Sequence, residues 1–404
     1  MKNFRNLFLG IGIAAALLVL YGYRLDFPHD VYYDEVYHVK QARDIAAFKG
    51  YAYIEHPPLG RILIALGIHL FGDKSWVWRI FPLIAGVGII FAVYFLARLL
   101  TGNARIALFS AFLMALDCVT LTQSRIAMLN TPALLFMLLS VICLAPYAVG
   151  KKGSRRKALI GTGIFFGLGA ACKITSLFIA GPLAFLWIKI LIDEKDKPAL
   201  LKETLLGLGL ALGVYFLSYS FIPFMKGKSW IDIWRAQVKM FSYHLHLKEA
   251  HRYGSEWWSW PLLIRPIWYY FKRAGSVWGI LSIGNPAIFW MIFPAIGYGS
   301  CLWVERKSFT LGFLLFSFFA SWLPYALGTR VKFFHYFVMV VPFGVMILAS
   351  ALDHLWKSGK IGRAAALGYL ILTAGMFIYW YPLLTGYPVS EAYFRHHLWF
   401  KSWV

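Results

Sequence analysis

Hydrophobic residues occur along this chain in runs of about twenty, separated by short polar stretches. A run of that length is long enough to cross the hydrocarbon core of a bilayer as a helix. The pattern predicts eleven spans, at 4–23, 79–98, 104–122, 130–149, 158–172, 174–192, 204–224, 284–304, 308–327, 333–356 and 364–383. We therefore expect an all-α, polytopic membrane protein in which residues 1–404 form a single domain.

Two runs need separate interpretation. The run at 4–23 is too long for the core of a signal peptide and lacks a small-residue cleavage site before Arg24, so we expect it to be retained as a span. The run at 57–71 is shorter and opens on Pro57 and Pro58. It suits an interfacial or re-entrant helix better than a span.

The positively charged short loops predict the orientation of the spans, because cytoplasmic loops carry an excess of Lys and Arg. On this rule the N-terminus lies in the cytoplasm together with four short loops, 151–157, 193–197, 305–307 and 357–363. The extracytoplasmic side then holds the first outer loop (24–78), the second outer loop (225–283) and the C-terminal tail (384–404). A span at 57–71 would turn every later basic loop outward, which favours the eleven-span interpretation.

Composition supports the same class of protein. Of 404 residues, 60% are hydrophobic and 14% are charged, whereas a soluble domain carries about 25% charged residues. The net charge of +22 is spread over the loops that flank the spans, which fits lipid headgroups and lipid phosphates and argues against nucleic acid. The cysteines fall inside apolar runs without metal-ligand spacing and are interpreted as core residues, namely Cys118, Cys143, Cys172 and Cys301.

The stretch "YYDEVYHV" (32–39) places Asp34, Glu35 and His38 directly after the first span, on the predicted outer face. Carboxylates in an interfacial loop are often ordinary solvated charges. On a helix, however, Asp34 and His38 would share one face, because residues four apart are neighbours there. The two carboxylates and the histidine are therefore candidates for acid–base chemistry or for a metal site.

Further polar groups are expected at the same membrane face. "HPPLGR" contributes His56 and Pro57, "QSR" contributes Arg125, the second outer loop contributes Trp258 and Arg265, and "RVKFFHYF" contributes Arg330, Lys332 and His335. Singly, these residues have plain structural explanations: prolines begin helices, tryptophans form interfacial belts and basic side chains reach toward headgroups. Together, carboxylates and separated cations on one face favour an enzyme that handles an anionic lipid.

These stretches resemble the protein O-mannosyltransferases. The resemblance extends over residues 20–345 and rests on "YYDEVYH", "HPPLGR", "QSR", "WWSWPLLIRP", "GNPAIFW" and "RVKFFHYF" in that order. It implies the GT-C membrane fold and the inverting transfer of mannose from polyprenyl- or dolichyl-phosphate-mannose to Ser or Thr of a secreted or membrane polypeptide.

Two features depart from the family. Asn130 stands where an acid is common, and the second outer loop is too short for the β-trefoil insert of eukaryotic members. We therefore expect a prokaryotic-type member in the plasma membrane.

The resemblance also implies roles for the candidate residues. Asp34 would be the base for the acceptor hydroxyl, with Glu35 either orienting the site or holding the peptide backbone. The lipid phosphate would be bound by Arg125, Arg330, Lys332 and His335. The donor and acceptor pocket would include His56, Pro57, Trp258 and Arg265. Lys173, between two expected spans, is either an anchor or a further phosphate partner.

No cofactor is required by this interpretation, although a divalent cation held by Asp34, Glu35 and His38 stays an open alternative. A second functional hypothesis is a GT-C transferase that moves another sugar from a polyprenyl phosphate to a glycan or glycolipid. A third is a lipid transporter or flippase, which would be expected to show inverted repeats or ionisable groups at mid-membrane. The sequence shows no such repeat, and most of its ionisable residues lie at span ends or in loops.

Overall fold

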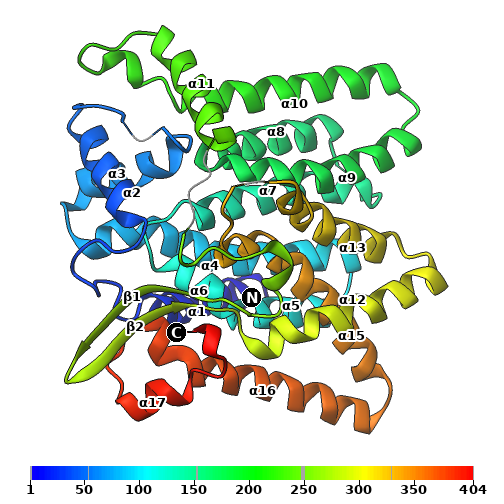
Figure 1. Ribbon diagram of the computed structural model, residues 1–404. Helices are drawn as coiled ribbons and strands as arrows, with labels where there is room; N and C mark the ends of the chain where they lie inside the picture. The colour runs from blue at the N-terminus through cyan, green and yellow to red at the C-terminus, as the bar shows by residue number, and fades with distance from the viewer. Residues whose placement is uncertain (1, 53, 152, 247–250, 329, 404) are drawn as a thin grey trace.

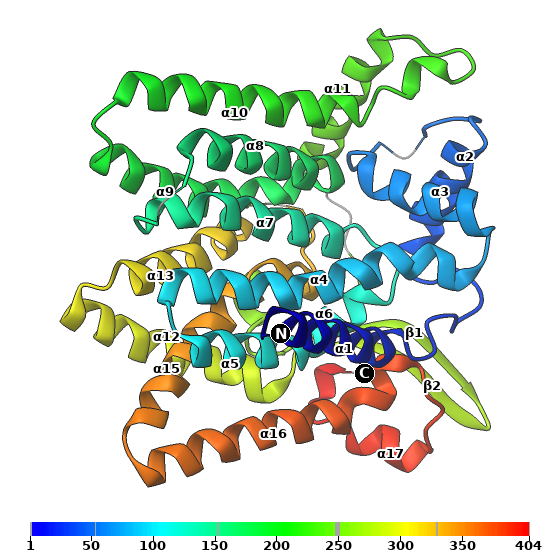
Figure 2. The same cartoon turned by 180° about the vertical axis from the view of Figure 1, so that it is seen from behind.

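The structure is a computed structural model that describes residues 2–52, 54–151, 153–246, 251–328 and 330–403. Its α-helices are α1 (Lys2–Gly22), α2 (Glu35–Ala46), α3 (Leu59–Phe71), α4 (Ser75–Thr101), α5 (Ala104–Ala115), α6 (Cys118–Ser124), α7 (Asn130–Ala148), α8 (Arg155–Cys172), α9 (Ala180–Asp193), α10 (Lys197–Leu217), α11 (Ile231–His246), α12 (Pro286–Arg306), α13 (Phe309–Trp322), α14 (Pro324–Leu327), α15 (Val341–Lys357), α16 (Lys360–Thr385) and α17 (Glu391–His396). Short 3-10 helices are η1 (Ile174–Ile179), η2 (Ile222–Phe224), η3 (Trp257–Ser259), η4 (Phe334–Met339) and η5 (Lys401–Trp403). The long helices lie side by side with roughly parallel axes (Figures 1 and 2).

Seven helical stretches within the described residues are long and apolar enough to cross a membrane. They are Ser75–Thr101, Asn130–Ala148, Ile174–Asp193, Lys197–Phe224, Pro286–Arg306, Phe309–Leu327 and Lys360–Thr385. Each coincides with one of the runs predicted from the sequence. The expected multi-pass membrane architecture is therefore confirmed.

The count of eleven stays a prediction. The expected span 4–23 lies almost wholly in α1 (Lys2–Gly22), within which the apolar stretch Phe8–Gly22 is shorter than a full span. The span 158–172 lies in α8, whose first turn holds three basic residues. The span 333–356 is divided between η4 and the 17-residue α15, because Pro342 at the start of α15 favours a new helix there.

The expected span 104–122 is broken. Helices α5 and α6 meet at an angle of 61°. Asp117 caps α6 by accepting hydrogen bonds from the backbone N–H (2.9 Å) and the hydroxyl (2.6 Å) of Thr120. The side-chain amide of Asn285 donates to the carbonyl of Leu116 (2.9 Å), which satisfies a group that the break exposes. With α5 and α6 counted as one span, the number of candidate spans becomes eight.

One β-hairpin departs from the all-helical expectation. Strands β1 (Ile267–Ala274) and β2 (Ser276–Ser282) pair antiparallel within the second outer loop and turn at Gly275, whose φ of 71° favours glycine. The hairpin projects from the same end of the helix bundle at which α2 and α3 lie (Figures 1 and 2). The segments expected on the outer face thus gather at one end.

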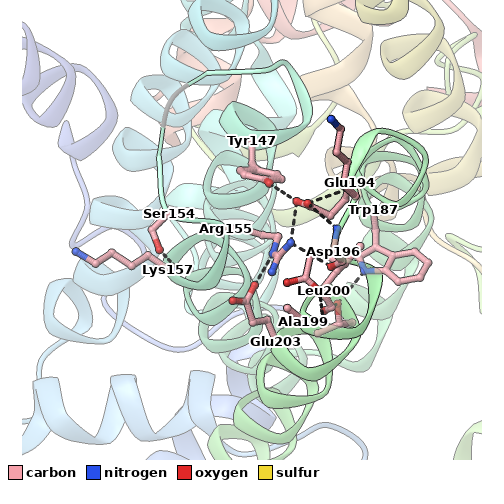
Figure 3. Close-up of polar contacts among 12 residues, drawn as sticks. Tyr147, Ser154, Arg155, Lys157, Trp187, Glu194, Asp196, Ala199, Leu200 and Glu203 are labelled. Carbon is pink, nitrogen blue, oxygen red and sulfur yellow. Dashed lines mark hydrogen bonds and ion pairs between the residues drawn. The ribbon is translucent and has the colours of Figure 1, made fainter.

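A polar network ties four helices together through two of the short loops predicted to share one side. Figure 3 shows Arg155, at the start of α8, between Glu194 and Glu203. Its guanidinium lies 2.7 Å from Glu194 and 2.5 Å from Glu203, and the hydroxyl of Tyr147 donates to Glu194 at 2.6 Å. The loops 151–157 and 193–197 therefore do lie at one end of the bundle. The apolar core lies between the long helices.

Candidate active site

A cavity of about 340 Å³ opens where the first outer loop meets the segment 330–336. Segments from five parts of the chain form its wall: the start of α2, the turn before α3 with the first turn of α3, the turn between α8 and η1, the end of α11 with His251, and the segment before and within η4. The side chains that line it are Tyr33, Asp34, Tyr37, His38, Glu55, His56, Arg61, Lys173, Tyr243, His251, Arg330, Val331, Phe333, His335 and Tyr336. The wall is thus unusually rich in titratable groups for an apolar protein.

Asp34 is the residue before the first turn of α2, a position at which aspartate commonly caps a helix. Within the described structure its carboxylate does not cap α2 and instead lines the cavity. Burial raises the pKa of Asp34 to about 6, while the positive charges of Lys173 and Arg330 oppose this rise. Asp34 is therefore mostly ionised at neutral pH, with a proton affinity that suits a general base.

Lys173 lies between α8 and η1 and is almost fully buried. Its ammonium group donates a 2.5 Å hydrogen bond to the side-chain oxygen of Asn130 and lies 4.9 Å from the ring centre of Tyr336. Burial lowers the pKa of Lys173 to about 8, and the negative charge of Asp34 opposes this decrease. The cavity thus holds a carboxylate and an ammonium that stabilise each other's charged forms.

Arg330 supplies a second cation. Its guanidinium donates to Nδ1 of His244, and Nε2 of His244 donates to the carbonyl of Glu55 at 2.7 Å. Burial and the charge of Arg330 lower the pKa of His244 to about 4, which agrees with a neutral imidazole that accepts at one nitrogen and donates at the other. The Nε of Arg330 is buried and has no hydrogen-bond partner among the described residues. That unused donor favours a ligand with acceptor oxygens.

Arg61 and two histidines form the neighbouring wall. The Nε of Arg61 donates to Nδ1 of His38 at 3.3 Å, and its terminal nitrogen lies 3.4 Å from the carboxylate of Glu55. Burial lowers the pKa values of His38 and His56 well below the usual range, with further decreases caused by the charges of Arg61 and Lys173. Both imidazoles are therefore neutral at neutral pH and act as hydrogen-bonding groups.

Glu35 lies behind the cavity instead of lining it. Its carboxylate accepts two hydrogen bonds from Arg79, at 2.8 and 2.9 Å, and one from the backbone N–H of Ala127 at 2.8 Å. Both charged side chains are fully buried. Arg79 also donates to the carbonyl of Leu25 at 2.8 Å. This buried pair therefore joins α2, α4 and the segment after α6.

Arg125 also has a different environment from the one expected. Its guanidinium donates to the carbonyls of Tyr21 and Arg24, the latter at 3.1 Å, and its backbone carbonyl accepts from the hydroxyl of Tyr32 at 3.3 Å. These contacts tie the end of α1 to the end of α6. Its Nε is buried without a hydrogen-bond partner among the described residues, and the predicted phosphate contact stays a prediction.

Of the residues singled out from the sequence, the structure brings together Asp34, His38, His56, Lys173, Arg330 and His335. The cavity wall does not include Glu35, Pro57, Arg125, Trp258, Arg265 or Lys332. Among these, Trp258 is half exposed, Arg265 donates to the carbonyl of Arg252, and Lys332 donates to the carbonyl of Gly328 at 2.9 Å. Sequence reasoning did not assign Arg61, although a cation at the start of an apolar helix was a usable signal.

The site offers no obvious metal centre. Within the described ranges, no group of three or more His, Cys, Asp or Glu side chains is placed to hold a metal ion. The set considered from the sequence is also divided, because Asp34 and His38 line the cavity whereas Glu35 binds Arg79. The charged groups available for an anionic ligand are instead lysine and arginine.

Two family models match this chain. The model for dolichyl-phosphate-mannose-protein mannosyltransferase matches residues 55–223, and the model for the C-terminal four-transmembrane region of protein O-mannosyltransferase matches residues 229–403. A polyprenol-phosphate-mannose–protein mannosyltransferase of Mycolicibacterium smegmatis is 24% identical over 88% of this chain and 83% of its own length. Another, from Corynebacterium glutamicum, is 26% identical over 92% of this chain and 88% of its own length.

Solved structures show the same fold. The protein O-mannosyltransferase Pmt1–Pmt2 complex of S. cerevisiae, bound to the sugar donor, matches with a TM-score of 0.85 at 15% identity, over 99% of this chain and 93% of that chain. ArnT from Cupriavidus metallidurans bound to undecaprenyl phosphate matches with a TM-score of 0.64 at 16% identity, over 94% of this chain and 74% of that chain. The fold is that of the GT-C membrane glycosyltransferases. Within that class, the chain belongs to the protein O-mannosyltransferase family.

Proposed function

We propose that this protein is an inverting glycosyltransferase that moves mannose from polyprenyl-phosphate-mannose to a Ser or Thr hydroxyl of a polypeptide. Relatives over nearly the whole chain are named for this activity. The single observation that carries the chemistry is the cavity in which Asp34 lies with two cations, Lys173 and Arg330. A sugar phosphate and a hydroxyl nucleophile require this combination of groups.

The proposed reaction is one direct displacement. The acceptor oxygen bonds to the anomeric carbon of mannose from the face opposite the phosphate, and the bond from that carbon to the phosphate oxygen breaks. Asp34 takes the hydroxyl proton as attack proceeds, because a hydroxyl is a weak nucleophile until its proton is removed. The electron pair of the broken bond leaves on the polyprenyl phosphate.

Lys173 and Arg330 stabilise the charge that develops on the leaving phosphate. Arg330 is suited to this role because a guanidinium can donate two parallel hydrogen bonds to phosphate oxygens. We assign the phosphate to these two residues instead of Arg125 and Lys332, since only the former pair lines the cavity. His335 and His56 would contribute hydrogen bonds from the wall.

We further propose that the cavity faces the extracytoplasmic side of a prokaryotic plasma membrane. In this arrangement 24–78, 225–283 and 384–404 are the outer segments of a single membrane domain. The basic short loops support this orientation. A cysteine placed at Lys239 should then react with an impermeant thiol reagent added to intact cells, whereas one at Ser154 should not.

The activity is tested with the purified protein in nanodiscs, supplied with polyprenyl-phosphate-mannose and a Ser/Thr-rich peptide. Mass spectrometry should find one added hexose on a hydroxyl side chain. Polyprenyl-phosphate-glucose and a glycolipid acceptor form the comparison arms. Transfer only in those arms would overturn the mannosyl and protein assignments, and transfer in none would overturn the proposed activity.

A further inference from the structure

Helix α11 has an apolar stripe whose residues are each more than half exposed, and within it Trp234 packs against the ring of Phe216 with 5.2 Å between ring centres. Ile231, Trp234, Val238, Phe241 and Leu245 are separated by three, four, three and four residues, so they lie on one side of the helix. All five are exposed, Val238 by 70% and Leu245 by 71%. A contiguous apolar patch of this kind marks an interaction surface.

The rest of the circumference divides into two other sides. Ile233, Ala236, Gln237 and Met240 are buried against the protein. The remaining side is polar and carries Arg235, Lys239, Ser242 and His246. At about 100° per residue, the order around the helix is the packed side, the exposed apolar side and the cationic polar side. A helix at a lipid–water interface shows this arrangement of apolar and cationic sides.

The position of α11 in the chain identifies what the stripe contacts. The membrane span Lys197–Phe224 ends only a few residues before α11 begins. The connection carries Lys226 and Lys228 between the exposed rings of Phe224 and Trp230. Aromatic and basic residues of this kind are enriched at membrane interfaces. Figures 1 and 2 show α11 at the end of the bundle where α2 and α3 also lie.

We propose that α11 lies in the lipid–water interface of the leaflet next to the cavity. The side that carries Trp234, Val238 and Leu245 enters the boundary between headgroups and acyl chains, and the side that carries Arg235 and Lys239 faces headgroups and water. The partner is therefore the lipid bilayer itself. A helix of this type penetrates about 5–10 Å into that boundary.

The same helix forms part of the cavity wall. Tyr243 lines the cavity, and His244 contacts both Arg330 and the carbonyl of Glu55. Insertion of α11 thus places the phosphate-binding cations at the depth of lipid headgroups. A lipid-linked donor would present its phosphate at that depth. This second step rests on the proposed function, whereas the insertion of α11 does not.

Site-specific labelling tests the insertion without any measurement of activity. Cys143 and Cys301 are replaced by Ala, while the buried Cys118 and Cys172 are kept. An environment-sensitive fluorophore is then attached to Val238→Cys or to the control Lys239→Cys in phosphatidylethanolamine/phosphatidylglycerol nanodiscs. The label at 238 should be quenched by doxyl-labelled lipid and protected from iodide, and the label at 239 should show the reverse.

Iodide quenching at both positions would overturn the proposal, because the stripe would then face water. Protection of position 238 from both quenchers would also overturn it, since a protein partner or a second copy would then cover the stripe. Either result leaves the proposed enzymatic activity untouched.

Kinetics test the link to the donor. Val238→Glu introduces a charge on the inserted side, and Ser242→Glu introduces the same charge on the polar side. Val238→Glu should raise the KM for a long-chain donor about three- to tenfold and leave the KM for a short-chain, water-soluble donor unchanged. Ser242→Glu should change neither value. Equal KM values of Val238→Glu and wild type for the long-chain donor would refute the link between the insertion of α11 and donor binding. Mannosyl transfer by the wild-type protein would still support the proposed function in that case.

Discussion

The ammonium of Lys173 is held by the neutral side chain of Asn130, at 2.5 Å, and no ion pair joins it to a carboxylate of the described residues. Asn130 is oriented in turn, because its amide donates to Gln123 at 2.6 Å and the amide of Gln123 donates to the hydroxyl of Tyr269. The chain of donors leaves only the oxygen of Asn130 to face Lys173. The lysine is therefore positioned by a neutral partner, and its charge stays available to the cavity, where it stabilises the ionised form of Asp34.

This arrangement predicts the effect of an acid at position 130. Asn130→Asp should pair with Lys173 and weaken its attraction for the donor phosphate, raising the donor KM about tenfold or more. Asp34 would lose part of its stabilising charge, so the acidic limb of the pH–rate profile should move to higher pH. Asn130→Ala adds no charge and should leave that limb in place. Identical limbs for wild type and Asn130→Asp would contradict the proposed role of Asn130.

Mutation of Asp34 tests its proposed role as the general base for the acceptor hydroxyl. Asp34→Asn should reduce kcat by about a hundredfold to ten-thousandfold, the usual contribution of a positioned general base. Thermal unfolding should change little, because the carboxylate lines a cavity and caps no helix in the described structure. Asp44→Asn, on the same helix but outside the cavity wall, serves as the control. Turnover near that of wild type in Asp34→Asn would remove this residue from the role.

The pH dependence follows from the same two residues. Below pH 6 Asp34 becomes protonated and can no longer accept the hydroxyl proton, so kcat/KM should fall as the pH decreases. Above pH 8 Lys173 loses its charge, so donor binding should weaken as the pH increases. A bell-shaped profile is expected. Lys173→Arg should move the alkaline limb beyond the assay range, because arginine stays charged.

The sequence predicted the long apolar helices well because each shows its character within its own residues. The break at Asp117 was not predictable in this way, since it depends on the hydrogen bond between Asn285 and Leu116, two residues that are 169 positions apart in the chain. The same holds for the site. The motifs brought Asp34 and Arg330 to one face, but the neighbours of Glu35 lie 44 and 92 residues away in the sequence. In the sequence alone, a residue that holds segments together, such as Glu35, could therefore not be distinguished from a residue that lines the cavity.

The buried pair of Glu35 and Arg79 should matter for stability. Removing one partner leaves a buried charge without compensation, which typically costs about 3–5 kcal/mol. Arg79→Met should therefore lower the free energy of unfolding by about that amount. Arg43→Met, which breaks the exposed pair between α2 and Asp73, should cost about 0–1 kcal/mol. Denaturation in detergent measures both, and equal losses would show that the buried pair has no special structural role.

Arg125 separates a structural role from a phosphate-binding role. Its guanidinium donates to the carbonyls of Tyr21 and Arg24, which fixes the end of α1 against α6. Arg125→Ala should therefore mainly lower the thermal stability, because one buried and one partly buried carbonyl lose a charged donor, at about 1.5–3 kcal/mol for each bond. Arg125→Lys should restore only part of this loss, since one ammonium cannot reproduce the fork of a guanidinium.

The donor KM of the folded fraction should stay near that of wild type in both variants, whereas Arg330→Ala should raise it. A large increase in donor KM for Arg125→Lys, with stability unchanged, would return Arg125 to the phosphate site and displace the assignment to Lys173 and Arg330.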